Sequence, residues 1–143
     1  MKSNNVRAPI ALVQQMNKIE TQAGLPKTAG YLYAKQTGNQ LHVSGQVPID
    51  TYGELVGKTD PHKQTQQCLA NLELLLECHG YEINDVQHLT VYVVGDRENL
   101  ASAWRAVKDM YPDGVPPSTL LGVALLGYEH QLVEIDAKVI KDS

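Results

Sequence analysis

The stretch DPHKQTQQCLANLELLLECHG, residues 60–80, decides the fold class of this chain. Its leucines recur on one helical face, Asp60 is placed to cap the first turn, Pro61 suits the first helical position, and Gly80 suits the residue after the last turn. The next apolar run, VQHLTVYVV over residues 86–94, is rich in β-branched residues and predicts a strand. A long helix that leads into a strand indicates a fold in which helices cover a sheet.

Helices and strands alternate on both sides of this stretch. Asp96 is placed to cap a second helix over residues 97–111, which stops at a Pro-Asp-Gly turn. Four further segments have the apolar pattern of strands, namely GYLYAKQTG (30–38), NQLHVSGQV (39–47), TLLGVALL (119–126) and QLVEIDAKVI (131–140). We therefore predict an α+β sandwich of two βαβ-type units, with both helices on one face of the sheet.

The N-terminal residues predict one more helix. Four apolar residues share one face of a helix over residues 8–23, namely Leu12, Val13, Met16 and Ile19. We expect residues 1–28 to form a helical extension and residues 29–143 to form one domain. The short apolar patch runs into charged helical sequence, so it lacks the form of a secretory signal.

Charge and cysteine content narrow the functional classes. The net charge of −4 argues against nucleic acid as the main partner, because phosphate binding requires a basic face. No window approaches the roughly 18 uninterrupted apolar residues of a membrane helix. Cys68 and Cys78 lie in one predicted helix, about 15 Å apart and too far to bridge. We therefore expect reduced thiols in a cytoplasmic protein that binds no membrane.

The last predicted strand has two unlike faces. One face carries Val133, Ile135, Ala137 and Val139, and the other carries Leu132, Glu134, Asp136 and Lys138. Because both helices are predicted on one side of the sheet, the semi-polar face stays open. Such a face on a small protein often becomes a subunit interface, and clefts between subunits often bind ligands. We expect an oligomer with its site at the seams.

The sequence lacks the common metal, cofactor and nucleophile motifs. Its five histidines include no pair at the i,i+4 spacing of a helical zinc motif. There is no Walker loop, no G-x-G-x-x-G and no G-x-S-x-G. Cys68 falls inside a predicted helix, where a buried and inert thiol is the usual case. We therefore expect neither a metal nor a cofactor.

Two local features point to chemistry. The first is Ser44–Gly45–Gln46 at the end of a predicted strand, where a glycine lets the backbone approach a ligand closely or simply marks a bulge before Pro48. The second is Glu134 in an otherwise apolar strand. A carboxylate there suits proton transfer to or from a bound water, or else forms an ion pair with Lys138 across a neighbouring strand.

Taken together, these segments resemble the RidA/YjgF family of reactive-intermediate deaminases, some of which carry the label endoribonuclease L-PSP. The resemblance covers roughly residues 29–140. It is carried by AGYLYAKQTGNQLHVSGQVPID, by QTQQCLANLELLLECHGYEINDV, by the VYVV strand and by the closing GVALL and LVEIDA. The most specific parts are VSGQVP, Asn71–Leu72 at the centre of the helix, and VEIDA.

The resemblance implies a fold similar to that of chorismate mutase, with three sheets meeting in a central barrel in a homotrimer. It also implies clefts between the subunits. The best-known members hydrolyse imines and enamines to a 2-keto acid and ammonia without a cofactor.

The resemblance also implies roles for individual residues. Tyr31 would orient the substrate, and Glu134 would hold the attacking water. Ser44 and Gly45 match the turn that supplies a backbone donor. The family's carboxylate-binding arginine is replaced by Ser118, and Leu120 stands where many members have cysteine. Since serine offers one neutral donor in place of a charged planar fork, we interpret Ser118 as space for a different substrate and not as a nucleophile.

Two functional hypotheses follow. One is a deaminase for an imine or enamine that lacks the usual carboxylate or places it elsewhere. The alternative is a non-catalytic trimer that binds a small metabolite or a partner protein in the same clefts. A third reading, endoribonuclease, is disfavoured by the acidic charge and by the lack of a basic groove.

Overall fold

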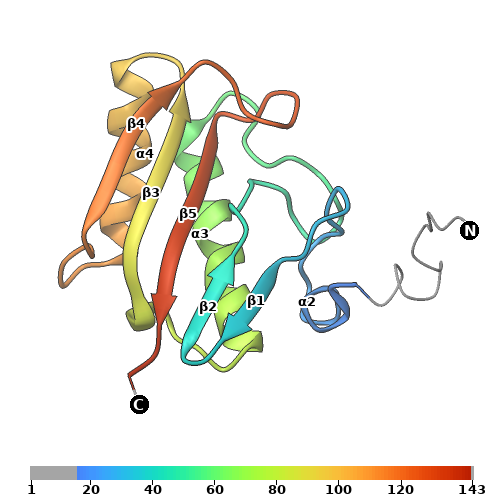
Figure 1. The fold of residues 1–143 in the computed structure, drawn as a ribbon. Coiled ribbons are helices and arrows are strands. Elements are labelled where there is room, and N and C mark those ends of the chain that lie inside the picture. The colour runs from blue at the N-terminus through green and yellow to red at the C-terminus, as the bar shows by residue number, and fades with distance from the viewer. Residues whose placement is uncertain (1–15, 143) are drawn as a thin grey trace, which may run out of the picture.

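A five-stranded sheet forms the centre of the fold (Figure 1). The computed structural model describes residues 16–142. The strands are β1 (Ala34–Thr37), β2 (Gln40–Val43), β3 (Val86–Val94), β4 (Ser118–Val123) and β5 (Val133–Ile140). Their order across the sheet is β1-β2-β5-β3-β4. β3 and β4 are parallel, and the other neighbours are antiparallel.

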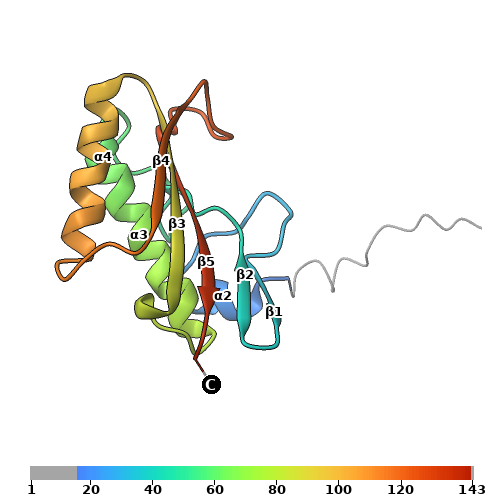
Figure 2. The ribbon, with the colours of Figure 1, turned by 60° about the vertical axis from the view of Figure 1, so that its left-hand side comes forward.

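Two long helices cover one face of this sheet, as the edge-on view in Figure 2 shows. They are α3 (Pro61–Cys78) and α4 (Arg97–Met110), and shorter turns occur at α2 (Lys18–Gln22) and at the 3-10 helix η1 (Ile83–Asp85). The α+β class and the placement of both long helices on one face are therefore confirmed.

Local sequence sets the ends of the long helices as predicted. The Asp60 carboxylate accepts a hydrogen bond from Lys63 N at 3.1 Å, and Pro61 occupies the first helical position. Asp96 caps α4 in the same way, accepting from Asn99 N at 3.0 Å. Gly80 follows α3 with a φ of 80°, a conformation that favours glycine.

The core lies between the helices and the sheet. The predicted α3 stripe of Leu69, Leu72, Leu75 and Leu76 is buried, as are Val133, Ile135 and Val139 on the facing side of β5. Each buried leucine stabilises the fold by roughly 1.5–3 kcal/mol. Glu134, Asp136 and Lys138 alternate with these core residues, so the predicted polar face of β5 is the face away from the helices.

Four strands, β1, β2, β4 and β5, are shorter than predicted. Residues 30–33 do not join β1, because the Asn17 side chain takes their backbone groups: Oδ1 accepts from Tyr33 N at 2.8 Å and Nδ2 donates to Tyr31 O at 2.9 Å. β2 ends at Val43, and β4 ends at Val123. After β2, pairing with β5 resumes only at Gln46, which bridges to Ile135.

The predicted N-terminal helix over residues 8–23 is present in part where the structure describes it. Only Lys18–Gln22 is helical, and Asn17 stands before it with a φ of 61°, which breaks the helix. Ile19 is 54% exposed, so the predicted apolar face is absent there. Glu20 is buried instead, where it pairs with His79 Nε2 at 2.5 Å. The remainder of the prediction, including Leu12 and Val13, lies outside the described residues.

Within residues 16–142, no helix combines the length and the apolar character needed to span a membrane.

Candidate active site

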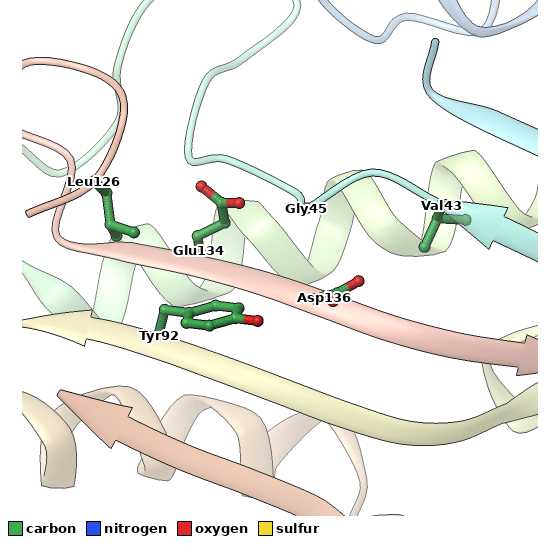
Figure 3. A pocket seen from close by; sticks show the side chains of 6 residues that line it. All are labelled: Val43, Gly45, Tyr92, Leu126, Glu134 and Asp136. Atoms are coloured by element: carbon green, nitrogen blue, oxygen red, sulfur yellow. The ribbon is translucent and has the colours of Figure 1, made fainter. Parts of the chain in front are cut away.

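Glu134 projects from β5 on the open face of the sheet, beside the segment that follows β2. Gln46 and Ile135 exchange two backbone hydrogen bonds, of 2.7 and 3.0 Å, and these bonds draw Ser44–Gln46 alongside β5. Figure 3 shows Glu134 and Asp136 on one strand, with the segment that carries Gly45 running past them. Glu134 therefore reaches this segment from the neighbouring strand.

Gly45 is needed for that approach. A Cβ atom at this position would lie 2.9 Å from Glu134 Cδ and 3.1 Å from Glu134 Cγ, and nearer still to Oε2. Any side chain at position 45 would therefore displace the carboxylate. The group that lies close to this glycine is therefore the carboxylate of the same chain.

Four predicted site residues line one pocket. Tyr31, Ser44, Gly45 and Glu134 surround a space of about 380 Å³, together with Ala29, Val47, Gly127 and Tyr128. A second pocket of about 260 Å³ shares Gly45 and Glu134 and adds Val43, Tyr92, Leu126 and Asp136 (Figure 3). The Glu134 carboxylate thus stands between two adjoining pockets.

A buried glutamine, Gln131, fixes the orientation of that carboxylate. Gln131 is 4% exposed, and its Nε2 donates to Glu134 Oε1 at 3.1 Å and to Val133 O at 3.0 Å. Its Oε1 accepts from Tyr128 N at 3.0 Å. All three bonds join residues of one loop and strand, so Gln131 couples the pocket tyrosine Tyr128 to Glu134.

A second buried glutamine, Gln64 of α3, holds the start of β5. Its Oε1 accepts from Leu132 N at 2.7 Å and from Val133 N at 3.2 Å. Its Nε2 donates to His130 O at 3.0 Å. Sequence analysis missed Gln64 and Gln131. Both are polar residues at positions where the apolar pattern of their neighbours predicts burial, and this was the signal that could have identified them.

Tyr31 lines the larger pocket together with Glu134. Burial chiefly, then a hydrogen bond with Tyr128 and the negative charge of Glu134, raise the pKa of Tyr31 well above its usual value. The Tyr31 hydroxyl therefore stays protonated at neutral pH and has a proton to donate. A phenol beside a carboxylate supplies both a hydrogen-bond donor and a base to one pocket.

Ser44 contributes a backbone and a hydroxyl group. Its N–H donates to Tyr33 O at 2.9 Å, which anchors the segment. Its Oγ is buried and has no hydrogen-bond partner among residues 16–142. A buried hydroxyl without a partner is uncommon in folded proteins, and it leaves a hydrogen bond to offer beside the pocket.

Ser118 and Leu120 do not join this site within one chain. Both lie on β4, which β3 separates from β5. Ser118 pairs with Leu89, and its Oγ donates to Pro116 O at 2.7 Å. Neither Ser118 nor Leu120 lines a pocket that contains Glu134. Leu120 is 37% exposed on this edge strand. A second copy of the chain would have to bring these positions to a Glu134 pocket.

The described part of the chain holds no cluster of metal-binding side chains, and its buried cysteine, Cys68, is protected from reaction. Residues 16–142 hold no group of three His, Cys, Asp or Glu side chains that could bind a metal ion. Burial, followed by the charge of Glu134, raises the pKa of the Cys68 thiol well above its usual value.

The alternative role of Glu134, an ion pair with Lys138, is not found among residues 16–142. Glu134 instead accepts a hydrogen bond from Gln131.

The open face of the sheet, with the Glu134 carboxylate lying against Gly45, agrees with the resemblance seen in the sequence. Comparison with known proteins shows the family. Residues 21–141 match the family model described as endoribonuclease L-PSP. The chain belongs to this family, the RidA/YjgF family.

Individual relatives cover most of the chain. A RutC family protein of Pyrococcus horikoshii is 36% identical over 82% of this chain and 92% of its own length. A 2-iminobutanoate/2-iminopropanoate deaminase of Salmonella typhimurium is 25% identical over 88% of this chain and 99% of its own. The crystal structure of a Thermotoga maritima protein superimposes with a TM-score of 0.76 at 32% identity, covering 85% of this chain and 94% of that one.

Proposed function

We propose that this protein is a cofactor-independent hydrolase that deaminates a reactive imine or enamine. The observation that carries the proposal is the Glu134 carboxylate, which Gln131 orients from one side and Gly45 admits from the other. The reaction is R₂C=NH + H₂O → R₂C=O + NH₃. The relative named as an imine deaminase supports the class of reaction.

The pocket residues divide the chemistry as follows. Water attacks the imine carbon while Glu134 takes one of its protons. The protonated Tyr31 hydroxyl donates a hydrogen bond to the substrate and so orients it. Glu134 returns the water proton to the nitrogen, which gives the carbinolamine R₂C(OH)NH₂. Glu134 then takes the hydroxyl proton of the carbinolamine and passes it to nitrogen, so that the C=O bond forms as the C–N bond breaks and ammonia leaves. A positioned acid or base of this kind contributes roughly 10²–10⁴ in rate.

The charge of the site favours a substrate without a carboxylate near Glu134. No Lys, Arg or His of residues 16–142 lines either pocket that contains Glu134, whereas Asp136 adds a second negative charge. Two carboxylates repel an anion and attract a protonated imine. We therefore propose altered substrate specificity relative to deaminases of 2-imino acids.

The test is hydrolysis of imines generated in place. An amino-acid oxidase would supply carboxylated imines, an amine oxidase would supply imines without a carboxylate, and semicarbazide would trap whatever is not hydrolysed. Added protein should lower the semicarbazone yield from the second source more than from the first. Glu134→Gln should abolish the effect, and Glu129→Gln, at an exposed neighbouring glutamate, should not. Turnover that survives in Glu134→Gln contradicts the proposal.

The alternative is a homotrimer that binds a small metabolite in the same clefts without turning it over. The observation that favours it is the position of Ser118, whose hydroxyl is taken up locally by Pro116 O. This alternative predicts a saturable ligand and no product, and Glu134→Gln would then change affinity alone.

A further inference from the structure

The backbone of Tyr31, which lies ahead of β1, is held by two side chains. Asn17 Nδ2 donates to Tyr31 O at 2.9 Å, and Thr28 Oγ1 donates to the same oxygen at 2.6 Å. Tyr31 N in turn donates to Thr28 Oγ1 at 3.2 Å. Both polar groups of the Tyr31 main chain are therefore bonded, and a residue that lines the Glu134 pocket is fixed at its backbone.

The amide of Asn17 also holds Tyr33 and Thr28. Its Oδ1 accepts from Tyr33 N at 2.8 Å, and its Nδ2 donates a second bond to Thr28 Oγ1 at 3.2 Å. An asparagine amide has two N–H donors and one oxygen acceptor, so every group of this amide is engaged. Turning the amide over would set a donor against Tyr33 N and an acceptor against Tyr31 O. Only one orientation of Asn17 therefore satisfies the network.

The segment that carries Asn17 is anchored on the helix layer. Glu20 of α2 is buried and pairs with His79 Nε2 at 2.5 Å, directly after the last turn of α3. Leu25 lies in one buried cluster with Leu75 of α3. These contacts are made on the helix side of the fold, so the anchor does not depend on the open face of the sheet.

Asn17 lies ahead of the residues that match the family model, which begin at residue 21. Its φ of 61° is a conformation that asparagine adopts more readily than most residues. A residue from before the family region thus supports the backbone of a pocket residue.

We propose that Asn17, together with Thr28, is a positioning residue that sets the place of the Tyr31 hydroxyl in the Glu134 pocket. Because both polar groups of the Tyr31 backbone are bonded, the side chain starts from a fixed point and its hydroxyl meets the substrate from one direction. A shift of about 1 Å in such a group costs roughly a hundredfold in rate. The inference rests on the proposed deaminase activity, in which Tyr31 orients the substrate.

The test compares single and double variants in the imine assay. Asn17→Gly removes the amide and keeps the backbone, because glycine adopts a φ of 61° without strain. We expect kcat/KM to fall roughly tenfold to a hundredfold. In a Tyr31→Phe background, which lacks the hydroxyl, the same change should cost less than about twofold. Additive losses overturn the proposal, because Asn17 would then act through a group other than the Tyr31 hydroxyl.

Asn39→Gly is the matched control. Asn39 Nδ2 donates to Lys141 O at 3.0 Å, so this variant loses the same side chain and a similar bond far along the chain from Tyr31. It should keep the activity of the unmodified protein. An equal loss in Asn39→Gly and Asn17→Gly would assign the effect to general destabilisation and overturn the proposal.

Thr28 provides an independent change in the same network. Thr28→Val keeps the shape of the side chain and removes the hydroxyl, whereas Thr28→Ser keeps the hydroxyl. Valine should lower kcat/KM about tenfold, and serine should stay within about twofold of the unmodified protein. Equal activity of the two variants contradicts the network.

A spectroscopic measurement separates failure of this inference from failure of the proposed activity. Fluorotyrosine incorporated into the full chain gives fluorine NMR signals, and Tyr31→Phe identifies the signal of Tyr31. That signal should shift by more than its linewidth in Asn17→Gly and stay in place in Asn39→Gly. If it shifts although the unmodified protein hydrolyses no imine, the proposed activity fails and Asn17 still positions Tyr31. If imines are hydrolysed but neither the signal nor kcat/KM responds to Asn17→Gly, this inference alone is overturned.

Discussion

Gln131 holds the Glu134 carboxylate in one orientation, with its Nε2 donating to Oε1 at 3.1 Å. The other carboxylate oxygen, Oε2, lies against Gly45. Because Gln131 is buried and its amide also bonds Val133 O and Tyr128 N, the donor cannot rotate away without breaking other bonds. Gln131 is thus a positioning residue for the glutamate that we expect to move the proton.

We therefore predict that Gln131→Met lowers kcat more than it changes KM. Methionine has a similar volume but donates no hydrogen bond, and a hydrogen bond to a charged group contributes about 1.5–3 kcal/mol. The expected loss is roughly tenfold or more in turnover of an imine, measured by semicarbazide competition. An unchanged kcat in a folded variant would remove the positioning role.

Gln131→Glu separates positioning from mere support of the loop. A glutamate keeps the acceptor for Tyr128 N but places a second carboxylate beside Glu134. Since two carboxylates that share a site resist full ionisation, the acid side of the pH–rate profile should move to higher pH. A profile identical to that of the unmodified protein would contradict this prediction.

Gly45→Ala should inactivate the site without unfolding the chain. The new methyl group would occupy the space of the Glu134 carboxylate and push it from its place. A misplacement of about 1 Å costs roughly a hundredfold in rate. Gly122→Ala is the matched control, because a Cβ there would meet only Val93 O, at 3.7 Å. Comparable loss of activity in both variants would count against a specific effect at Gly45.

The sequence predicted the elements whose causes are local. The caps of α3 and α4 and the alternation along β5 need only neighbouring residues, and all three were confirmed. The support of the site was not predictable in this way. Gln64 meets Leu132 across 68 residues, and Asn17 takes the backbone of Tyr33 from outside the sheet. Those contacts depend on the tertiary fold, so no local pattern signals them.

Tyr111→Phe should leave the protein equally stable or raise the free energy of unfolding by about 1 kcal/mol at pH 7. The Tyr111 hydroxyl is buried and has no hydrogen-bond partner among residues 16–142. A buried polar group without a partner is destabilising, and phenylalanine removes it. Chemical denaturation would measure the change, with Tyr52→Phe, at a residue 85% exposed, as the control. A clear destabilisation would show that the hydroxyl is bonded in solution.

The same tyrosine should make stability fall at alkaline pH. Burial, followed by the charge of Glu73, raises the pKa of Tyr111 from 10.0 to about 12. Above pH 10 the unfolded chain loses this proton while the folded chain keeps it, so the free energy of unfolding decreases as pH rises from 10 to 12. Tyr111→Phe should make that decrease smaller. An equal decrease in both proteins would assign it to other groups.

Ser118→Arg should create activity on carboxylated imines, and only through a neighbouring subunit. In one chain Ser118 lies on β4, with β3 between it and the Glu134 strand, and it lines no Glu134 pocket. An arginine that reaches a neighbour's pocket would offer two charge-assisted bonds to a carboxylate, for a gain of roughly 10–100-fold in kcat/KM.

The same pairing of subunits can be tested by mixing chains. The double variant Ser118→Arg with Glu134→Gln and the unmodified chain should each be poor on this substrate, because one lacks the glutamate and the other lacks the arginine. Oligomers assembled from both together would unite the arginine of one chain with Glu134 of the next and recover the activity. If the single variant gains activity but the mixture does not, both residues act from one chain, and the cleft between subunits is not the site.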